Sequence, residues 1–213
     1  MKEVLATVLT LASLQVVPPT FVPARYRSGS LPVQPPQVVG GGQALLEVKV
    51  GNDGSVIQAF TLRSTPPFTE LLVEAVRSWR FEAAEDRGQD VESAVLLAGL
   101  FRPPTLFGPA PGEPPLDVGT ATDAIPIPYS MVPPDFPPGA LADAVVLVEA
   151  LVERDGTVKQ AHAVRSVPGF DDAATKAAVQ WKFRPARRDG VPVPSFAYIV
   201  FGFRQPVTPP RPR

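Results

Sequence analysis

The sequence predicts an α+β fold made of two tandem ββαβ domains, in each of which a three-stranded antiparallel sheet packs on one helix. Three observations lead to this prediction: an internal repeat, apolar alternation on both sides of Asp-Gly turns, and a helical apolar period before the last strand of each copy. The chain of 213 residues has room for two domains of about 100 residues each.

The repeat is clearest at two motifs. The segment Asn52–Val56 (NDGSV) resembles Arg154–Val158 (RDGTV), and Trp79-Arg80-Phe81 resembles Trp181-Lys182-Phe183. Both motifs have the same spacing of 102 residues, and both tryptophans of the chain fall in register. The shared spacing indicates that one structural unit occurs twice, the first copy being the more divergent.

Apolar residues occupy every second position before each Asp-Gly pair, as is typical of strands with one buried face. Asp53-Gly54 and Asp155-Gly156 are hairpin turn signals, because glycine tolerates a positive φ. The predicted strands cover residues 44–51, 56–62 and 91–102 in the first copy and 146–153, 158–164 and 193–204 in the second.

A helix is expected between the second and third strands of each copy. In the second copy Phe170, Ala174, Ala177 and Trp181 recur at helical spacing. Asp171 stands at the expected helix start, as Thr69 does in the first copy, and both residue types can cap a helix.

Proline marks the expected boundaries. The chain has 28 prolines, well above a usual share of about 5%, and they gather between the copies and at the C-terminus. The predicted layout is domain 1 at 31–103, a Pro-rich linker at 104–129, domain 2 at 130–205 and a disordered tail at 206–213.

Residues 1–30 have three interpretations. The apolar run Val4–Val17 has the length of a signal-peptide core and is too short to span a bilayer. It is also compatible with a packed helix. The third interpretation is a remnant of an earlier repeat, because Phe21–Arg25 (FVPAR) is similar to the FRPAR that starts at Phe183.

Composition excludes several classes of function. There is no cysteine and one histidine, so thiolate chemistry, disulfides and His-rich metal sites are excluded. A formal net charge of −1 gives no basic footprint for nucleic acid.

The second copy resembles the TonB C-terminal domain family. The resemblance rests on Asp155–Val158 (DGTV), Trp181–Ala186 (WKFRPA) and Asp189–Pro194 (DGVPVP). The first copy keeps Asp53-Gly54 and the Trp79 motif, so it resembles a divergent member.

The resemblance implies a periplasmic or otherwise exported protein-binding module of the cell envelope, and not an enzyme. It implies no cofactor, no metal and no small-molecule substrate. The implied partner is an envelope protein or peptide, such as a TonB-dependent outer-membrane receptor, bound by strand addition. Two alternatives stay open: an energy transducer for TonB-dependent transmembrane transport that acts with a separate membrane anchor, and a structural repeat protein that self-associates.

The last strand is the predicted binding edge, because Pro194–Arg204 is long, aromatic and uncharged before its final residue. An exposed edge offers unpaired N–H and C=O groups to a guest strand. The residues predicted to contact the partner are Phe196, Tyr198, Ile199, Val200 and Phe201.

One charge pattern separates the copies. Opposite charges at matched positions suggest either pairing of the two repeats or the steering of an acidic partner. We favour a third interpretation, independent variation on solvated loops, where an exposed pair contributes at most about 1 kcal/mol. The candidate electrostatic contacts are Arg184, Arg187 and Arg188, which match Glu82, Glu85 and Asp86.

His162 has no carboxylate or cysteine near it in the sequence, so we expect an ordinary surface or packed residue. The same reasoning assigns Asp171 and Asp172 to helix capping and both tryptophans to the core.

Overall fold

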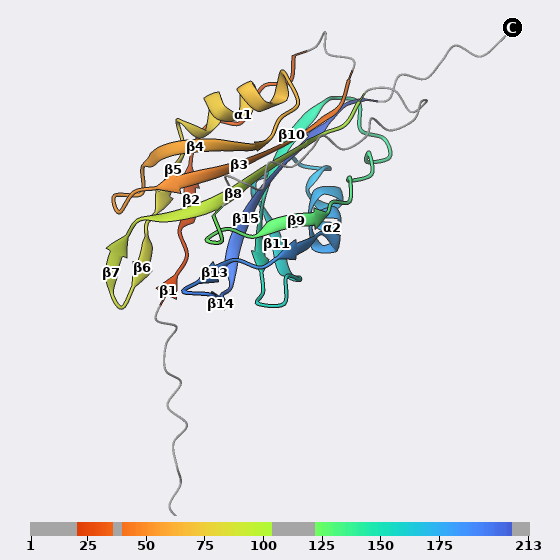
Figure 1. Cartoon of the computed structure of the whole chain (residues 1–213). Coiled ribbons are helices and arrows are strands. Elements are labelled where there is room, and N and C mark those ends of the chain that lie inside the picture. The colour runs from red at the N-terminus through yellow and green to blue at the C-terminus, as the bar shows by residue number, and fades with distance from the viewer. Residues whose placement is uncertain (1–20, 36–39, 104–121, 206–213) are drawn as a thin grey trace, which may run out of the picture.

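The structure is a computed structural model that describes residues 21–35, 40–103 and 122–205. The predictions for residues 1–20, 104–121 and 206–213 lie outside the described residues. Within the described ranges the main feature is a six-stranded sheet of order β11-β10-β15-β8-β3-β4 (Figure 1). Its strands are β3 (Gly42–Val50), β4 (Val56–Arg63), β8 (Ser93–Phe101), β10 (Ala144–Val152), β11 (Val158–Arg165) and β15 (Ser195–Phe203).

The order of elements is the same in both halves. In the first half α1 (Phe68–Val76) lies between β4 and β8, and in the second α2 (Asp171–Gln180) lies between β11 and β15. The predicted α+β class and both predicted hairpins, β3–β4 and β10–β11, are confirmed. The predicted strand ends differ from the observed ones by at most two residues.

The two halves join in one sheet, so the prediction of two separate three-stranded sheets is wrong. β8 and β15 pair in parallel from Leu96 opposite Ala197 to Phe101 opposite Gly202. Both strands are apolar along their length and almost wholly buried. Each would otherwise leave an apolar edge without a hydrogen-bonding partner, and their pairing removes both edges.

The helices cover opposite faces of this sheet, as Figure 1 shows. Along β15, Ile199 and Phe201 belong to the core cluster that contains α2 residues, whereas Tyr198 and Val200 belong to the cluster that contains α1 residues. Because β8 and β15 are parallel, an approximate two-fold rotation about an axis along these strands exchanges the halves.

Each tryptophan anchors one of the two cores. Trp79 and Trp181 are fully buried. The indole N–H of Trp79 donates to the carbonyl of Ser30 at 2.8 Å, and that of Trp181 donates to the carbonyl of Val132 at 2.9 Å. The two acceptors are also 102 residues apart, so the matched tryptophans have matched partners.

Short strands complete each half. β2 (Arg25–Ser28) pairs with β5 (Arg80–Glu82), as β9 (Ile127–Ser130) pairs with β12 (Lys182–Arg184). The predicted domain starts at 31 and 130 therefore fall after β2 and at the end of β9. Two hairpins lie at the end of the sheet where β8 and β15 begin. The first pairs β6 (Ala84–Asp86) with β7 (Gln89–Val91), and β1 (Phe21–Val22) pairs with the other side of β6. The second pairs β13 (Arg187–Arg188) with β14 (Val191–Pro192).

The helix starts differ from the prediction in one respect. Asp171 is the first residue of α2, and its carboxylate accepts a hydrogen bond from the N–H of Val167 at 2.9 Å. The hydroxyl of Thr69 accepts from the N–H of Thr65 in the same way at 2.9 Å. Both side chains therefore accept a hydrogen bond from a backbone N–H of the loop that precedes the helix, and neither residue is the N-cap.

Candidate binding site

The predicted binding edge does not exist in this structure. β15 pairs with β10 on one side and with β8 on the other, so the prediction that it is an edge strand is wrong. Of the five residues assigned to partner contact on that basis, Tyr198, Ile199, Val200 and Phe201 are fully buried and Phe196 is partly buried. Their sequence looked like an edge because a strand in the middle of a sheet and an apolar edge strand have the same composition.

The free edges of the main sheet belong to β4 and β11. Within the described residues no strand pairs with the outer side of either. Single bridges at Ser55 and Thr157 come just before these two strands. Each edge therefore offers a row of backbone N–H and C=O groups, the chemical requirement for strand addition.

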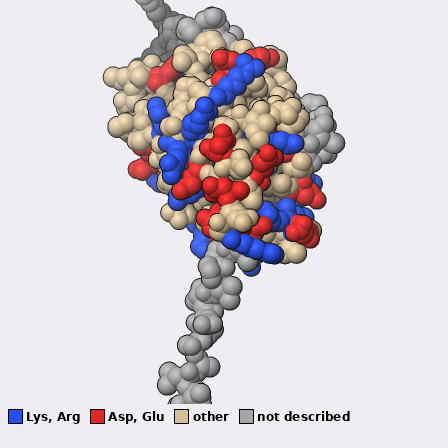
Figure 2. All heavy atoms as spheres, turned by 90° about the vertical axis from the view of Figure 1, so that its left-hand side faces the viewer, with Lys and Arg blue, Asp and Glu red and all other residues tan. Residues whose placement is uncertain are grey.

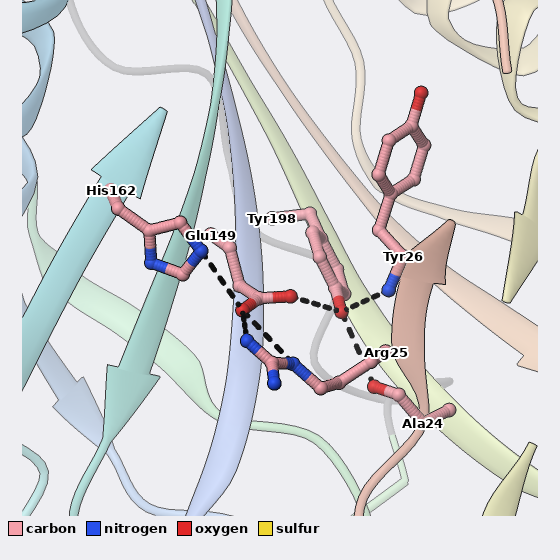
Figure 3. Close-up of polar contacts among 6 residues, drawn as sticks. All are labelled: Ala24, Arg25, Tyr26, Glu149, His162 and Tyr198. Atoms are coloured by element: carbon pink, nitrogen blue, oxygen red, sulfur yellow. Dashed lines mark hydrogen bonds and ion pairs between the residues drawn. The ribbon is translucent and has the colours of Figure 1, made fainter. Parts of the chain in front are cut away.

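A buried carboxylate fixes the sheet next to the β11 edge (Figure 3). Glu149 of β10 is only 1% exposed. Its Oε1 accepts from Nη2 of Arg25 at 2.8 Å and lies 3.4 Å from Nε2 of His162, and its Oε2 lies 3.1 Å from the hydroxyl of Tyr198. These contacts tie β2, β10, β11 and β15 together.

Tyr198 serves as both acceptor and donor in this cluster. Its oxygen accepts from the N–H of Tyr26 at 2.8 Å, and its single proton is shared between Glu149 and the carbonyl of Ala24. Burial, reinforced by the charge of Glu149, raises the pKa of the Tyr198 hydroxyl well above its usual value. The hydroxyl therefore stays protonated and remains a donor.

The pKa values of Arg25 and Tyr26, which contact Glu149 and Tyr198, are also raised. The hydrogen bond to Glu149, and then its charge, raise the pKa of Arg25. Burial raises the pKa of the Tyr26 hydroxyl. A permanently charged guanidinium thus compensates the buried carboxylate.

The contact of His162 and the matched positions of Glu47 and Glu149 were not predicted from the sequence. His162 has no carboxylate near it in the sequence, but the fold makes Glu149 its cross-strand partner. Glu149 and Glu47 each interrupt an apolar strand and are 102 residues apart, and both are 1% exposed. A charge repeated at matched positions inside two apolar strands was the available signal.

We expect Glu149→Gln to lower the free energy of unfolding by about 2 kcal/mol, because it removes the charge-assisted bonds but keeps the shape. Urea denaturation measures this change. Glu47→Gln is the matched variant: Glu47 accepts from the N–H and hydroxyl of Thr122 at 2.9 and 2.8 Å. Salt should leave the stability losses of both variants nearly unchanged, since the carboxylates are buried. A Glu149→Gln protein as stable as the parent would contradict the stabilising role of the contacts around Glu149.

The candidate arginines lie on and beside the hairpins at one end of the sheet. Nη2 of Arg188 lies 2.8 Å from Oδ2 of Asp86, its matched position in the other half, and the guanidinium stacks on Phe21 at 4.4 Å from the ring centroid. Arg187 donates to the carbonyl of Gly190, and Arg184 is exposed on β12. The favoured interpretation, independent variation on solvated loops, is therefore wrong for Asp86 and Arg188, which pair across the two halves.

The surface around the β6–β7 hairpin is mixed in charge. Figure 2 shows acidic and basic side chains interspersed on this side of the molecule. Glu82, for example, pairs with Arg27 at 3.4 Å, both side chains being largely exposed. This side therefore has no broad patch of one sign to steer a charged partner.

We expect a double-mutant cycle with Asp86→Ala and Arg188→Ala to give a coupling free energy of about 0.5 kcal/mol at low salt, and less at 1 M NaCl. The stacking on Phe21 is lost in both variants that lack Arg188, so it cancels. Urea titrations of the four proteins provide the measurement, and zero coupling at low salt would mean that the hairpins do not meet in solution.

Within the described residues, neither helix has the length and the apolar composition that crossing a membrane requires. In the same ranges no group of three or more His, Cys, Asp or Glu side chains is placed to hold a metal ion.

Comparison with known proteins finds one family that matches part of the chain. Residues 137–204 match the family described as Gram-negative bacterial TonB protein C-terminal. The match covers β10 to β15 with the preceding turn. A search of curated proteins found no match. The TonB C-terminal domain is a periplasmic protein-interaction domain that contacts other envelope proteins, such as outer-membrane receptors, and is not an enzyme family.

Proposed function

We propose that this protein is a binding module of the cell envelope that captures a partner protein or peptide by strand addition to the outer side of β11. The observation that carries the proposal is the position of β11. This strand lies within residues 137–204, which match the TonB C-terminal family, and its outer side has no neighbouring strand among the described residues. A guest strand there would extend the six-stranded sheet.

The surroundings of β11 suit a docking edge. Its inner side pairs with β10, and α2 packs against it, so the edge is held in place before a guest arrives. A preformed edge reduces the entropy lost on binding. Lys159, the second residue of β11, pairs at 3.1 Å with Glu153 of the turn that precedes the strand.

Proline substitution of the edge tests the proposal. Neighbouring residues of a strand direct their N–H groups to opposite sides, so Ala161→Pro and His162→Pro are both made and the variant that keeps the fold is used. Its matched control on β4 is Ala59→Pro or Phe60→Pro. The full chain then serves as bait for envelope extract of the source bacterium.

We expect the β11 variant to lose captured proteins that the parent and the β4 variant retain. Equal capture by all three proteins would place the site away from β11. Capture of the same chain alone, with a closed dimer in light scattering, would favour the structural self-associating alternative.

A second candidate is energy transduction for TonB-dependent transport together with a separate membrane anchor, which the family match favours. Its test is energy-dependent uptake through an outer-membrane receptor in a strain that lacks this protein. Uptake restored by the parent chain but not by the β11 variant would support it, and normal uptake without the protein would reject it.

We also propose that the two halves are copies of one ancestral unit. The matched order of elements, the matched tryptophan bonds and the matched glutamates support this proposal.

A further inference from the structure

We propose that the outer edge of β4, together with the groove between β4 and α1, binds an extended segment that carries Lys or Arg at alternate positions. This site is separate from the β11 edge and does not depend on it. Three features carry the inference: a strand whose outer edge has no partner among the described residues, a hollow beside it, and the spacing of two glutamates on the helix.

The hollow lies on the α1 face of the sheet, next to the free edge. It has a volume of about 550 Å³ and is open to solvent. It is lined by Thr61 and Ser64 from the β4 side and by Glu70, Val73, Glu74 and Arg77 from the helix side. A strand added to β4 would therefore direct every second side chain into this groove.

The backbone of β4 favours an added strand. Its exposed residues are apolar or neutral: Ile57, Gln58 and Thr61 are exposed, and its one charged residue is Arg63, which is 7% exposed. Edge strands that resist pairing usually carry lysine, proline or other charged residues along the edge.

The spacing of the two glutamates selects the guest. Glu70 and Glu74 are four residues apart on α1, which separates them by about 6 Å along the helix. Alternate residues of a strand are about 6.6 Å apart. Basic residues at positions i and i+2 of a guest can therefore each meet one carboxylate. Arg77, 3.1 Å from Glu74, is an exposed partner that such a guest would replace.

Short synthetic peptides test this site on the full chain. The probe is a capped (Lys-Thr)4 peptide, compared with a block peptide of four lysines followed by four threonines, which has the same charge. Binding is measured by fluorescence anisotropy and located by amide chemical shifts. We expect the alternating peptide to bind at least about fivefold more tightly and to shift the resonances of residues 57–61 and of α1.

Charge reversal provides the second arm. Glu70→Lys with Glu74→Lys is expected to weaken binding of (Lys-Thr)4 by about tenfold, through two lost ion pairs and new repulsion. Asp172→Lys, at the position of α2 that matches Glu70, is the control and should change affinity less than about twofold. Equal binding of the two peptides, unchanged binding after the reversal, or shifts confined to β11 would each overturn the proposal. The first two outcomes leave the proposed capture at β11 untouched.

Discussion

Trp181→Ala is expected to lower the free energy of unfolding by about 4 kcal/mol. The indole is fully buried between the sheet and α2, with ring centroids 6.0 Å from Phe183 and 5.8 Å from Phe201. Its removal leaves a large cavity and an unpaired carbonyl on Val132. Urea denaturation followed by circular dichroism measures the loss.

Two variants separate the causes. Trp181→Phe fills most of the volume but loses the N–H donor, and should cost about 1.5 kcal/mol. Trp79→Ala removes the matched indole of the other half and should cost about as much as Trp181→Ala, because both are fully buried. A loss below about 1.5 kcal/mol for Trp181→Ala would contradict its role as a core anchor.

Gly156→Ala is expected to destabilise the fold by about 3 kcal/mol or more. Gly156 has a φ of 81°, and an added Cβ would collide with the carbonyl oxygen of Phe183. The N–H of Phe183 donates to the carbonyl of Gly156 at 2.9 Å, so the turn and β12 cannot separate without breaking that bond. Thermal unfolding is the measurement.

The control for this prediction is Gly190→Ala. Gly190 has a similar φ of 77°, but within the described part of the chain an added Cβ there would meet no atom within 4 Å apart from its two chain neighbours. It should therefore cost only the backbone strain of about 1 kcal/mol. Equal losses of stability for the two variants would show that the expected collision with the carbonyl oxygen of Phe183 adds no destabilisation.

Local structure could be predicted from the sequence because its causes are local. The Asp-Gly turns, the alternation of β3 and β10, and the helical spacing before each tryptophan all act within about ten residues. They led to the correct hairpins, both helices and the repeated order of elements. The matched spacing also drew attention to the opposite charges at positions 86 and 188, but independent variation was the favoured interpretation, and the structure places the two residues in contact.

The assembly of the halves could not be predicted in the same way. Whether β8 and β15 are edges or neighbours depends on contacts about 100 residues apart, and an apolar strand satisfies both arrangements. The prediction of a binding edge therefore fell on the best-covered strand of the sheet. Likewise, the contact of Arg25 with Glu149 joins residues 124 positions apart, and no local pattern announces it.

The most direct test of the account locks β8 to β15 and asks whether binding survives. The chain has no cysteine, so Ala98→Cys with Ile199→Cys, at paired positions of the two strands, introduces the only thiols. Neighbouring strands lie about 4.8 Å apart, within the range that a disulfide spans. We expect the disulfide to form on mild oxidation and the oxidised protein to capture the same envelope proteins as its reduced form. Thiols that do not cross-link, or capture that is lost on oxidation and restored by reduction, would contradict a permanently covered β15 with binding at the outer edges.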